Sequence, residues 1–502
     1  MPPYRLFQQS SSFFANAALL VGGTGLSQLI IAGTAPLLTR LYSPREFGVY
    51  AVVLALVNFV AAIVCARYEV AVVLPRTNRE AANLVALALL AAVAVSAGTA
   101  VVAFVAWLWF GAGQPRLFGL LAALLPLSAL AAALQQILRS WLIRVHMFTA
   151  ITVMMVIQAV VMVSLQLAAG AISGSSALYL VAASLIGTVM SVLCVAPSQM
   201  GQSVAGLRQA VSMKRIAFVA RRYRRFPLYT APYSLVSQLS QRGPIFLLAV
   251  LGSAAAIGSF ALAQRTIYLP ITVVVVSLSQ AFFRRAAGNL HRRDVPELVR
   301  RVLVSSALVF GPLFAISAFN MPGIFAFVFG AQWRPAGEYG AWLACAAIMM
   351  FLTYWLDRVY DMLGRQRLAL VMEASYNLVS LLLFALILHF ERSVLLAVAA
   401  FSVVSAAYGI VYLAVTLRIA RFDIRILGET VLALLAVAAY CGVLNFVLGK
   451  LFGYGVAYGV LLVLASLPPV VLGVLTAVQK IRLRPLGVPE ATPPMPESSL
   501  AP

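Results

Sequence analysis

Long apolar stretches recur along almost the whole chain, separated by polar or Gly/Pro-containing breaks. Each is close to the length of about 20 residues that an α-helix needs to span the hydrocarbon core of a bilayer. The chain has 63% hydrophobic and only 10% charged residues. This composition is too apolar for a soluble globular protein. The expected fold is an all-α polytopic membrane protein. About 14 spans are predicted, at 12–39, 47–66, 81–110, 117–137, 150–170, 177–195, 228–251, 257–282, 302–320, 341–362, 368–389, 393–416, 429–448 and 454–478.

The chain is strongly basic, with 36 Lys and Arg against 14 Asp and Glu and a net charge of +22. If the spans alternate in direction, most of these basic residues fall on one side of the membrane, with large groups at 208–225 and 284–301. Basic residues concentrate on the cytoplasmic side of membrane proteins. We therefore expect both termini in the cytoplasm. Topology accounts for most of the charge, so membrane lipids are expected partners and nucleic acid is not.

An internal repeat is visible at an offset of 210 residues, which places Ser27-Gln28 on Ser237-Gln238 and Gly48 on Gly258. The same offset carries the first predicted span onto the seventh. Because six spans per unit is an even number, the repeat would be parallel, about an axis along the membrane normal. We expect an N-lobe at 1–195, a basic cytoplasmic linker at 196–227, a C-lobe at 228–416, two further helices within 417–484 and a disordered Pro-rich tail at 485–502.

Two arginines, Arg242 and Arg265, fall inside predicted spans. An ionisable group in the membrane costs several kcal/mol and marks a functional site. They lie roughly 14 and 12 Å from the outer ends of consecutive antiparallel helices, at nearly one depth. No acidic residue is predicted at that depth. A shared anion site is therefore favoured over arginines that snorkel or pair with a carboxylate.

Three carboxylates form a second group of candidates. Asp357 and Asp361 are one helical turn apart, and Glu373 is at a similar height in the next span. They form either a coupling site for a proton or Na⁺ or an inner-gate ion-pair cluster with neighbouring arginines, and the ion-pair interpretation is favoured. No metal, cofactor or ATP-binding site is expected, because Cys and His are scattered and no Walker A motif is present.

Several segments resemble the oligosaccharide flippases of the Wzx type: LLTRLYSPREFGVYA (37–51), RYEVAVVLPR (67–76), GSFALAQRTIYLP (258–270), SLSQAFFRRA (277–286) and VFGAQWRPAGEY (328–339). The resemblance extends across nearly the whole chain. It implies the multidrug/oligosaccharidyl-lipid/polysaccharide exporter superfamily, with two six-helix lobes that work by alternating access. The implied substrate is a glycan on undecaprenyl pyrophosphate, moved to the periplasmic leaflet of a bacterial inner membrane for polysaccharide or lipopolysaccharide biosynthesis. Polysaccharide polymerase machinery is an expected partner.

Under this interpretation Arg242 and Arg265 hold the pyrophosphate, because the planar donor fork of Arg matches phosphate. Arg40 and Arg67 are contacts where the substrate enters or leaves, or else interfacial anchors. Asp357 and Asp361 are not part of the segments that resemble the family.

Other functions stay open. One is a lipid II-type or drug/cation exporter of the same superfamily, although an exporter of cationic drugs should place acidic groups in its cavity. A membrane-embedded glycan polymerase or ligase is a different class of protein. Such an enzyme is not expected, because the longest predicted outer loop, 321–340, contains few groups suited to catalysis.

Overall fold

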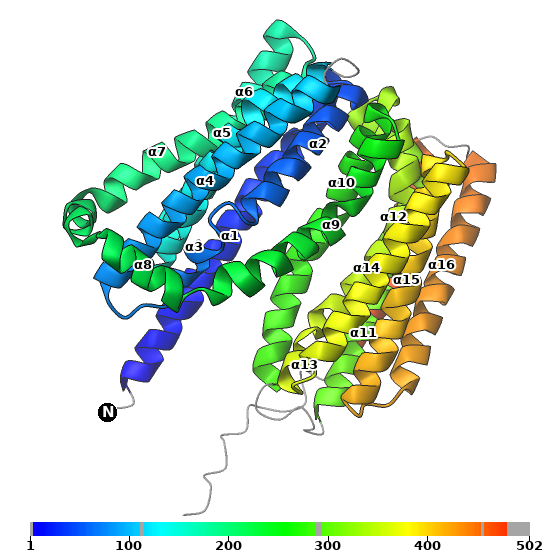
Figure 1. The fold of residues 1–502 in the computed structure, drawn as a ribbon. Coiled ribbons are helices and arrows are strands. Elements are labelled where there is room, and N and C mark those ends of the chain that lie inside the picture. Colours follow the sequence, from blue (N-terminus) through cyan, green and yellow to red (C-terminus); the bar gives the residue numbers. More distant parts are fainter. Residues whose placement is uncertain (1–3, 111–114, 287–293, 453–455, 479–502) are drawn as a thin grey trace, which may run out of the picture. The chain divides into compact units, whose positions relative to one another are not determined.

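The computed structural model describes residues 4–110, 115–286, 294–452 and 456–478, and every regular element among them is a helix (Figure 1). Eleven of these helices are long and apolar enough to cross a membrane. The predicted all-α polytopic membrane fold is thereby confirmed. The count of fourteen is not: the predicted spans 12–39 and 228–251, and the described part of 454–478, are helical but do not belong to the eleven. The predicted tail at 485–502 lies outside the described residues.

Contacts between residues group the chain into two compact units. Unit 1 comprises Met1–Val276, Asn320–Ala347 and Leu370–Tyr408, and unit 2 comprises Ser277–Phe319, Ile348–Ala369 and Gly409–Pro502. The predicted division into an N-lobe, a linker, a C-lobe and two further helices has different boundaries from these units. It stays a prediction.

Unit 1 contains a bundle of long helices that pack side by side (Figure 1). A polar network holds three of them together, because Gln135 of α5 donates to Gln158 of α6 at 2.8 Å and Gln158 donates to Thr188 of α7 at 3.0 Å. Inside a bilayer such groups must find protein partners, since no water is there to replace them. The helices are α1 (Tyr4–Leu41), α2 (Pro44–Ala61), α3 (Tyr68–Ala71), α4 (Asn78–Phe110), α5 (Pro115–Arg144), α6 (Phe148–Ser173), α7 (Ala177–Ala210), α8 (Met213–Arg222), α9 (Ala231–Leu251) and the first part of α10 (Ala254–Ala286).

The later helices are divided between the units or belong to unit 2. In unit 2, Phe310 of α11 packs on Phe351 of α12 with ring centroids 4.5 Å apart. Gly311 faces Val437 of α16. The helices are α11 (Asp294–Phe329), α12 (Arg334–Thr353), α13 (Arg358–Met362), α14 (Gln366–Phe390), α15 (Val394–Ile419), α16 (Arg425–Phe452), α17 (Val456–Ala465) and α18 (Leu467–Val478).

The repeat at an offset of 210 residues is visible in helix capping. Ser43 precedes α2, and its Oγ accepts a hydrogen bond from the Glu46 amide at 3.4 Å. Ser253 precedes α10, and its Oγ accepts from the Ala256 amide at 3.2 Å. Ser43 matches Ser253 and Glu46 matches Ala256 under this offset. Both hydroxyls satisfy an amide that the first turn of a helix leaves without an intrahelical partner.

The same offset appears in a reciprocal contact between α2 and α10. A Cβ on Gly48 would lie 1.6 Å from the Ala254 carbonyl oxygen, and one on Gly258 would lie 2.0 Å from that of Pro44. Gly48 and Gly258 are equivalent in the repeat, and so are Pro44 and Ala254. When residue i contacts j and its equivalent contacts the equivalent of j, the two elements are related by a local two-fold axis. The two glycines therefore allow equivalent helices to touch through their backbones.

Among the differences from the predicted spans, three change the course of the chain. Helix α2 ends at Ala61 rather than 66, and the turns that follow it lead to Ala66 and Arg67, whose backbones are left-handed (φ 50° and 62°). The linker predicted at 196–227 is largely helical, since α7 continues to Ala210 and α8 follows. The predicted span 341–362 is interrupted by a 3₁₀ turn at Tyr354–Leu356, before α13.

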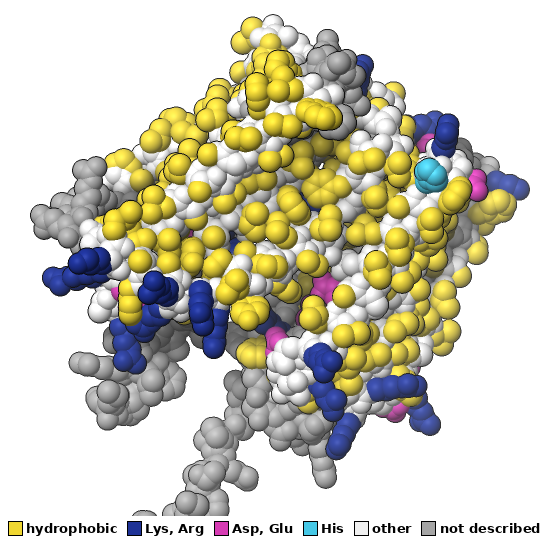
Figure 2. All heavy atoms as spheres, viewed as in Figure 1, with side chains coloured by type: hydrophobic (Ala, Val, Ile, Leu, Met, Phe, Trp, Pro, Cys, Tyr) yellow, Lys and Arg dark blue, Asp and Glu magenta, His cyan; other side chains and the backbone are white. Residues whose placement is uncertain are grey.

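Apolar side chains cover the outer faces of the helices, as expected for contact with lipid (Figure 2). Lys and Arg side chains gather over α8 and the residues after it, where Lys214, Arg215, Arg221, Arg222 and Arg224 are all exposed. Ile216 and Val219 are buried on the opposite face of α8. The helix is thus amphipathic, which suits a position at a membrane surface.

Candidate functional site

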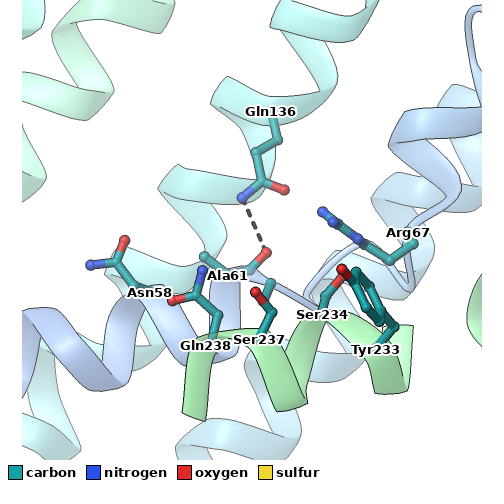
Figure 3. Close-up of a pocket in the computed structure, with 9 residues that line it drawn as sticks. Asn58, Ala61, Arg67, Gln136, Tyr233, Ser234, Ser237 and Gln238 are labelled. Carbon is teal, nitrogen blue, oxygen red and sulfur yellow. Dashed lines mark hydrogen bonds between the residues drawn. The ribbon is translucent and has the colours of Figure 1, made fainter. Parts of the chain in front are cut away.

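A polar pocket of about 240 Å³ lies in unit 1 among α2, α5, α9 and the turn that follows α2 (Figure 3). Amide, hydroxyl and guanidinium groups from all four segments face it. Its position is set in part by Gln136 of α5, whose Nε2 donates to the carbonyl oxygen of Ala61 at 3.1 Å. The lining residues are Asn58, Ala61, Ala62, Arg67, Gln136, Tyr233, Ser234, Ser237 and Gln238.

Arg67 reaches this pocket because of the turn on which it lies. Its neighbours Cys65 and Tyr68 are buried in an apolar cluster with Ile137 and Val219, which fixes the turn on both sides. The left-handed backbone at Arg67 is uncommon for a residue with a side chain. Such conformations cluster at functional sites, where the surrounding packing maintains them.

Arg67 pairs with an acidic residue. Its Nη1 lies 3.4 Å from the Glu69 Oε1, and the Glu69 side chain is only 5% exposed. Both residues lie in the connection between the membrane-spanning helices α2 and α4. Burial raises the pKa of the Glu69 carboxyl, and this effect outweighs the opposing influence of Arg67. Arg67 is thus paired with a carboxyl that is itself largely buried.

Helix α9 places Ser234, Gln238 and Arg242 at intervals of four residues, on one face. Ser234 and Gln238 line the pocket, and Arg242 follows one turn further along. Among the described residues, the Gln238 Oε1 and the Arg242 Nε are buried and have no hydrogen-bond partner. Buried polar atoms without a partner are uncommon, and each calls for an explanation such as a ligand.

Arg265 lies on α10, close enough to Tyr50 of α2 for an electrostatic interaction. Arg242 is nine residues before the end of α9 and Arg265 eleven after the start of α10, or about 14 and 17 Å along their axes. In the part of the chain that the structure describes, neither arginine forms an ion pair with a carboxylate. Their role as a shared anion site stays a prediction.

The structure separates Arg40 from Arg67. Arg40 is exposed in the last turn of α1, before α2 begins, whereas Arg67 follows the far end of α2. The 18 residues of α2 correspond to about 27 Å. These two arginines therefore cannot contact one phosphate group together.

The three candidate carboxylates have different surroundings. In unit 2, the Asp357 Oδ1 accepts a hydrogen bond from the Tyr412 hydroxyl at 2.6 Å. Asp361 pairs with Arg358 at 3.3 Å, and both side chains are about half-exposed. Glu373 is exposed on the part of α14 that belongs to unit 1. A coupling role for any of the three stays a prediction.

Comparison with known proteins identifies the family. The sequence profile of the polysaccharide biosynthesis protein family matches residues 37–338. The chain belongs to this family. The search of curated proteins found no match.

Solved structures with a similar fold share little sequence with this family member. The lipid II flippase MurJ in an inward closed conformation has a TM-score of 0.69 at 14% identity, over 92% of this chain and 99% of that one. An inward-facing multidrug resistance MATE transporter of the MOP superfamily has a TM-score of 0.55 at 13% identity, over 80% and 96%. A MOP superfamily transporter from Pyrococcus furiosus has a TM-score of 0.52 at 13% identity, over 82% and 95%. These similarities confirm the fold that the sequence resemblance implies.

The neutral lining of the pocket was missed from sequence, where only ionisable groups were considered. Asn58, Gln136 and Gln238 carry no charge. The free-energy cost of placing them in a membrane span is therefore too small to mark them as a functional site. A signal was available in the YSLVSQLSQR segment at 233–242, where polar residues recur every three or four positions. That spacing places them on one face of a helix.

No metal site is evident in the described ranges, where no group of three or more His, Cys, Asp or Glu residues is arranged to hold an ion.

Proposed function

We propose that this protein is a flippase that moves an undecaprenyl-pyrophosphate-linked oligosaccharide from the cytoplasmic to the periplasmic leaflet of a bacterial inner membrane. The observation that carries the proposal is the presence of Arg242 on α9 and of Arg265 on α10, which is long and apolar enough to cross a membrane, with no carboxylate partner for either among the described residues. A charge in this environment is costly unless it is paired. A pyrophosphate, which is a multiply charged anion, would pair with both.

The family supports a role in polysaccharide biosynthesis. The fold shared with MurJ and MATE transporters supports a cycle of alternating access, because proteins of these two kinds are described as inward closed and inward-facing. In such a cycle the arginines bind the pyrophosphate on the cytoplasmic side and release it on the periplasmic side. The lipid tail stays in the bilayer while the glycan passes through the protein.

Arg67 suits the recruitment of the substrate at the cytoplasmic side, since it follows a membrane span and faces a pocket. Arg40, at the opposite end of α2, suits release. With both termini in the cytoplasm, this assignment places Arg67 at the cytoplasmic leaflet and Arg40 at the periplasmic leaflet. Asp357, Asp361 and Glu373 are the candidates for coupling to a proton or Na⁺, and the glycan polymerase machinery would receive the product.

The test is transport in proteoliposomes with a fluorescent undecaprenyl-pyrophosphate oligosaccharide. Arg242→Ala and Arg265→Ala should each lower the initial rate about 10- to 100-fold, since each removes charge-assisted hydrogen bonds to the pyrophosphate. Arg418→Ala is the matched control, because Arg418 is exposed in the last turn of α15. Wild-type rates in both variants would contradict the proposal. Transport of a lipid II analogue in preference to the oligosaccharide would instead assign the protein to lipid II-type export.

A further inference from the structure

We propose that the polar pocket of unit 1 binds one sugar ring of the lipid-linked substrate, namely the ring joined directly to the pyrophosphate. This inference rests on the proposed function and adds a saccharide subsite to it. Three observations carry it: the chemistry of the lining, the buried amide of Gln238, and the position of Arg242 along α9.

The lining is mostly neutral and able both to donate and to accept hydrogen bonds. It presents the carboxamides of Asn58, Gln136 and Gln238, with hydroxyls on α9 and a single guanidinium from Arg67. Carboxamides and hydroxyls match the hydroxyl groups of a sugar, which also donate and accept. A phosphate at neutral pH mainly accepts, so a site built for phosphate alone would consist of donors.

Gln238 also favours a sugar over a phosphate as the ligand of the pocket. Its Oε1 is buried and has no hydrogen-bond partner in the described part of the protein. A hydroxyl group can donate to this oxygen, whereas an ionised phosphate has no proton to offer. If the amide is rotated to present its nitrogen, a hydroxyl oxygen can accept, so a sugar satisfies either orientation.

The shape of the pocket also suits one sugar ring. Figure 3 shows Arg67 and Tyr233 on one side of the pocket and Asn58 and Gln238 on the other. The Tyr233 side chain is 62% exposed, so its ring is free to lie against the apolar face of a sugar. The volume of about 240 Å³ is below the roughly 300–1,000 Å³ of sites for drug-sized ligands. It therefore fits a single ring and not a whole oligosaccharide.

The position of the pocket links it to the proposed anion site. Gln238 and Arg242 are four residues apart on α9, so about 6 Å, slightly more than one helical turn, separates them along the axis. A sugar bonded directly to a pyrophosphate lies within that range of the phosphate oxygens. The two unsatisfied atoms, Gln238 Oε1 and Arg242 Nε, thus match two adjacent groups of one substrate.

The experiment measures binding of lipid probes to the full-length protein in nanodiscs. The probes are undecaprenyl pyrophosphate, the same lipid with one hexose, and the hexose lipid with its hydroxyls methylated. Gln238→Leu and Asn58→Leu should weaken binding of the hexose lipid about tenfold, the effect of losing a buried hydrogen bond, and leave undecaprenyl pyrophosphate within about twofold. Ser237→Ala, which removes only a hydroxyl from a half-buried position, should act in the same direction. Wild-type protein should bind the methylated lipid no better than undecaprenyl pyrophosphate.

Gln366→Leu is the matched control, since Gln366 is an exposed amide at the start of α14. Equal weakening of both lipids by Gln238→Leu and Ser237→Ala would show that the pocket holds the pyrophosphate, and would overturn the inference. Unchanged binding of both lipids would place the pocket outside the substrate site and would also overturn it. If wild-type protein binds none of the probes, the proposed function itself fails, which distinguishes that result from the other two.

Discussion

In the connection that follows α2, the carboxyl group of Glu69 is largely buried. Its Oε1 contacts Arg67, while its Oε2 is buried and has no hydrogen-bond partner within the described residues. A carboxylate in this position is incompletely solvated, which is the cause of its raised pKa. This ion pair lies beside the pocket that Arg67 lines.

This raised pKa predicts how stability depends on pH. A group whose folded-state pKa lies above its unfolded-state value stabilises the protein fully below the unfolded value, and that contribution is lost as the pH rises through the folded-state pKa. The loss should therefore begin near the ordinary Glu value of 4.5. We expect the melting temperature of the wild type, relative to Glu69→Gln, to decrease as the pH rises above that value.

The measurement is thermal unfolding in detergent across this pH range, with Glu391→Gln as the control because Glu391 is exposed. A difference between wild type and Glu69→Gln that stays constant, or that grows with pH, would show that the carboxyl is not destabilised in its ionised form.

At the scale of elements, the contact between α2 and α10 depends on two glycines. The position of each is filled on one side by the backbone of the equivalent helix, at Ala254 and Pro44. Small residues at helix crossings allow close approach of backbones in membranes, where the hydrophobic effect does not drive helices together. The two helices that the repeat relates are thus similar in sequence and also in direct contact at the local two-fold axis between them.

Substitution at either glycine should therefore destabilise the protein. Gly48→Ala and Gly258→Ala place a methyl group within 2.0 Å of a carbonyl oxygen, and the backbone must move to accommodate it. We expect a loss of about 1–3 kcal/mol, as for overpacked cores, measured as a lower melting temperature in detergent. Gly98→Ala on α4 is the control, because its Cβ meets nothing within 4 Å. Equal melting temperatures for all three variants would refute the close contact.

At the scale of the whole molecule, the proposed topology assigns each connection between helices to one side of the membrane. Helix α7 has 34 residues, or about 51 Å, which exceeds the roughly 30 Å hydrocarbon core of a bilayer. Under the proposed topology, its two ends lie on opposite sides of the membrane. The distribution of basic residues predicts that the end near Ser175 is periplasmic and the end near Met213 is cytoplasmic.

Cysteine labelling checks this orientation. On a background without the four native cysteines, Ser175→Cys should react in intact cells with a membrane-impermeant maleimide. Met213→Cys, at a side chain 76% exposed, should react only after the membrane is permeabilised. The reverse pattern would invert the topology and the proposed direction of transport.

Much of this protein follows from its sequence alone. Hydropathy and charge act locally, so the many apolar helices and the arginines within them can be predicted without tertiary information. The repeat is equally accessible, because equivalent serines and glycines keep one offset through Ser43 and Ser253 or Gly48 and Gly258.

The tertiary structure alone decided what surrounds these residues. Arg67 and Gln238 line one pocket because α2 and α9, far apart in sequence, pack together, and because a left-handed turn directs the chain after α2. Neutral amides such as Gln136 give no hydropathy signal strong enough to mark a site. Their role depends on which backbone groups and cavities they meet, and only packing between distant helices determines those contacts.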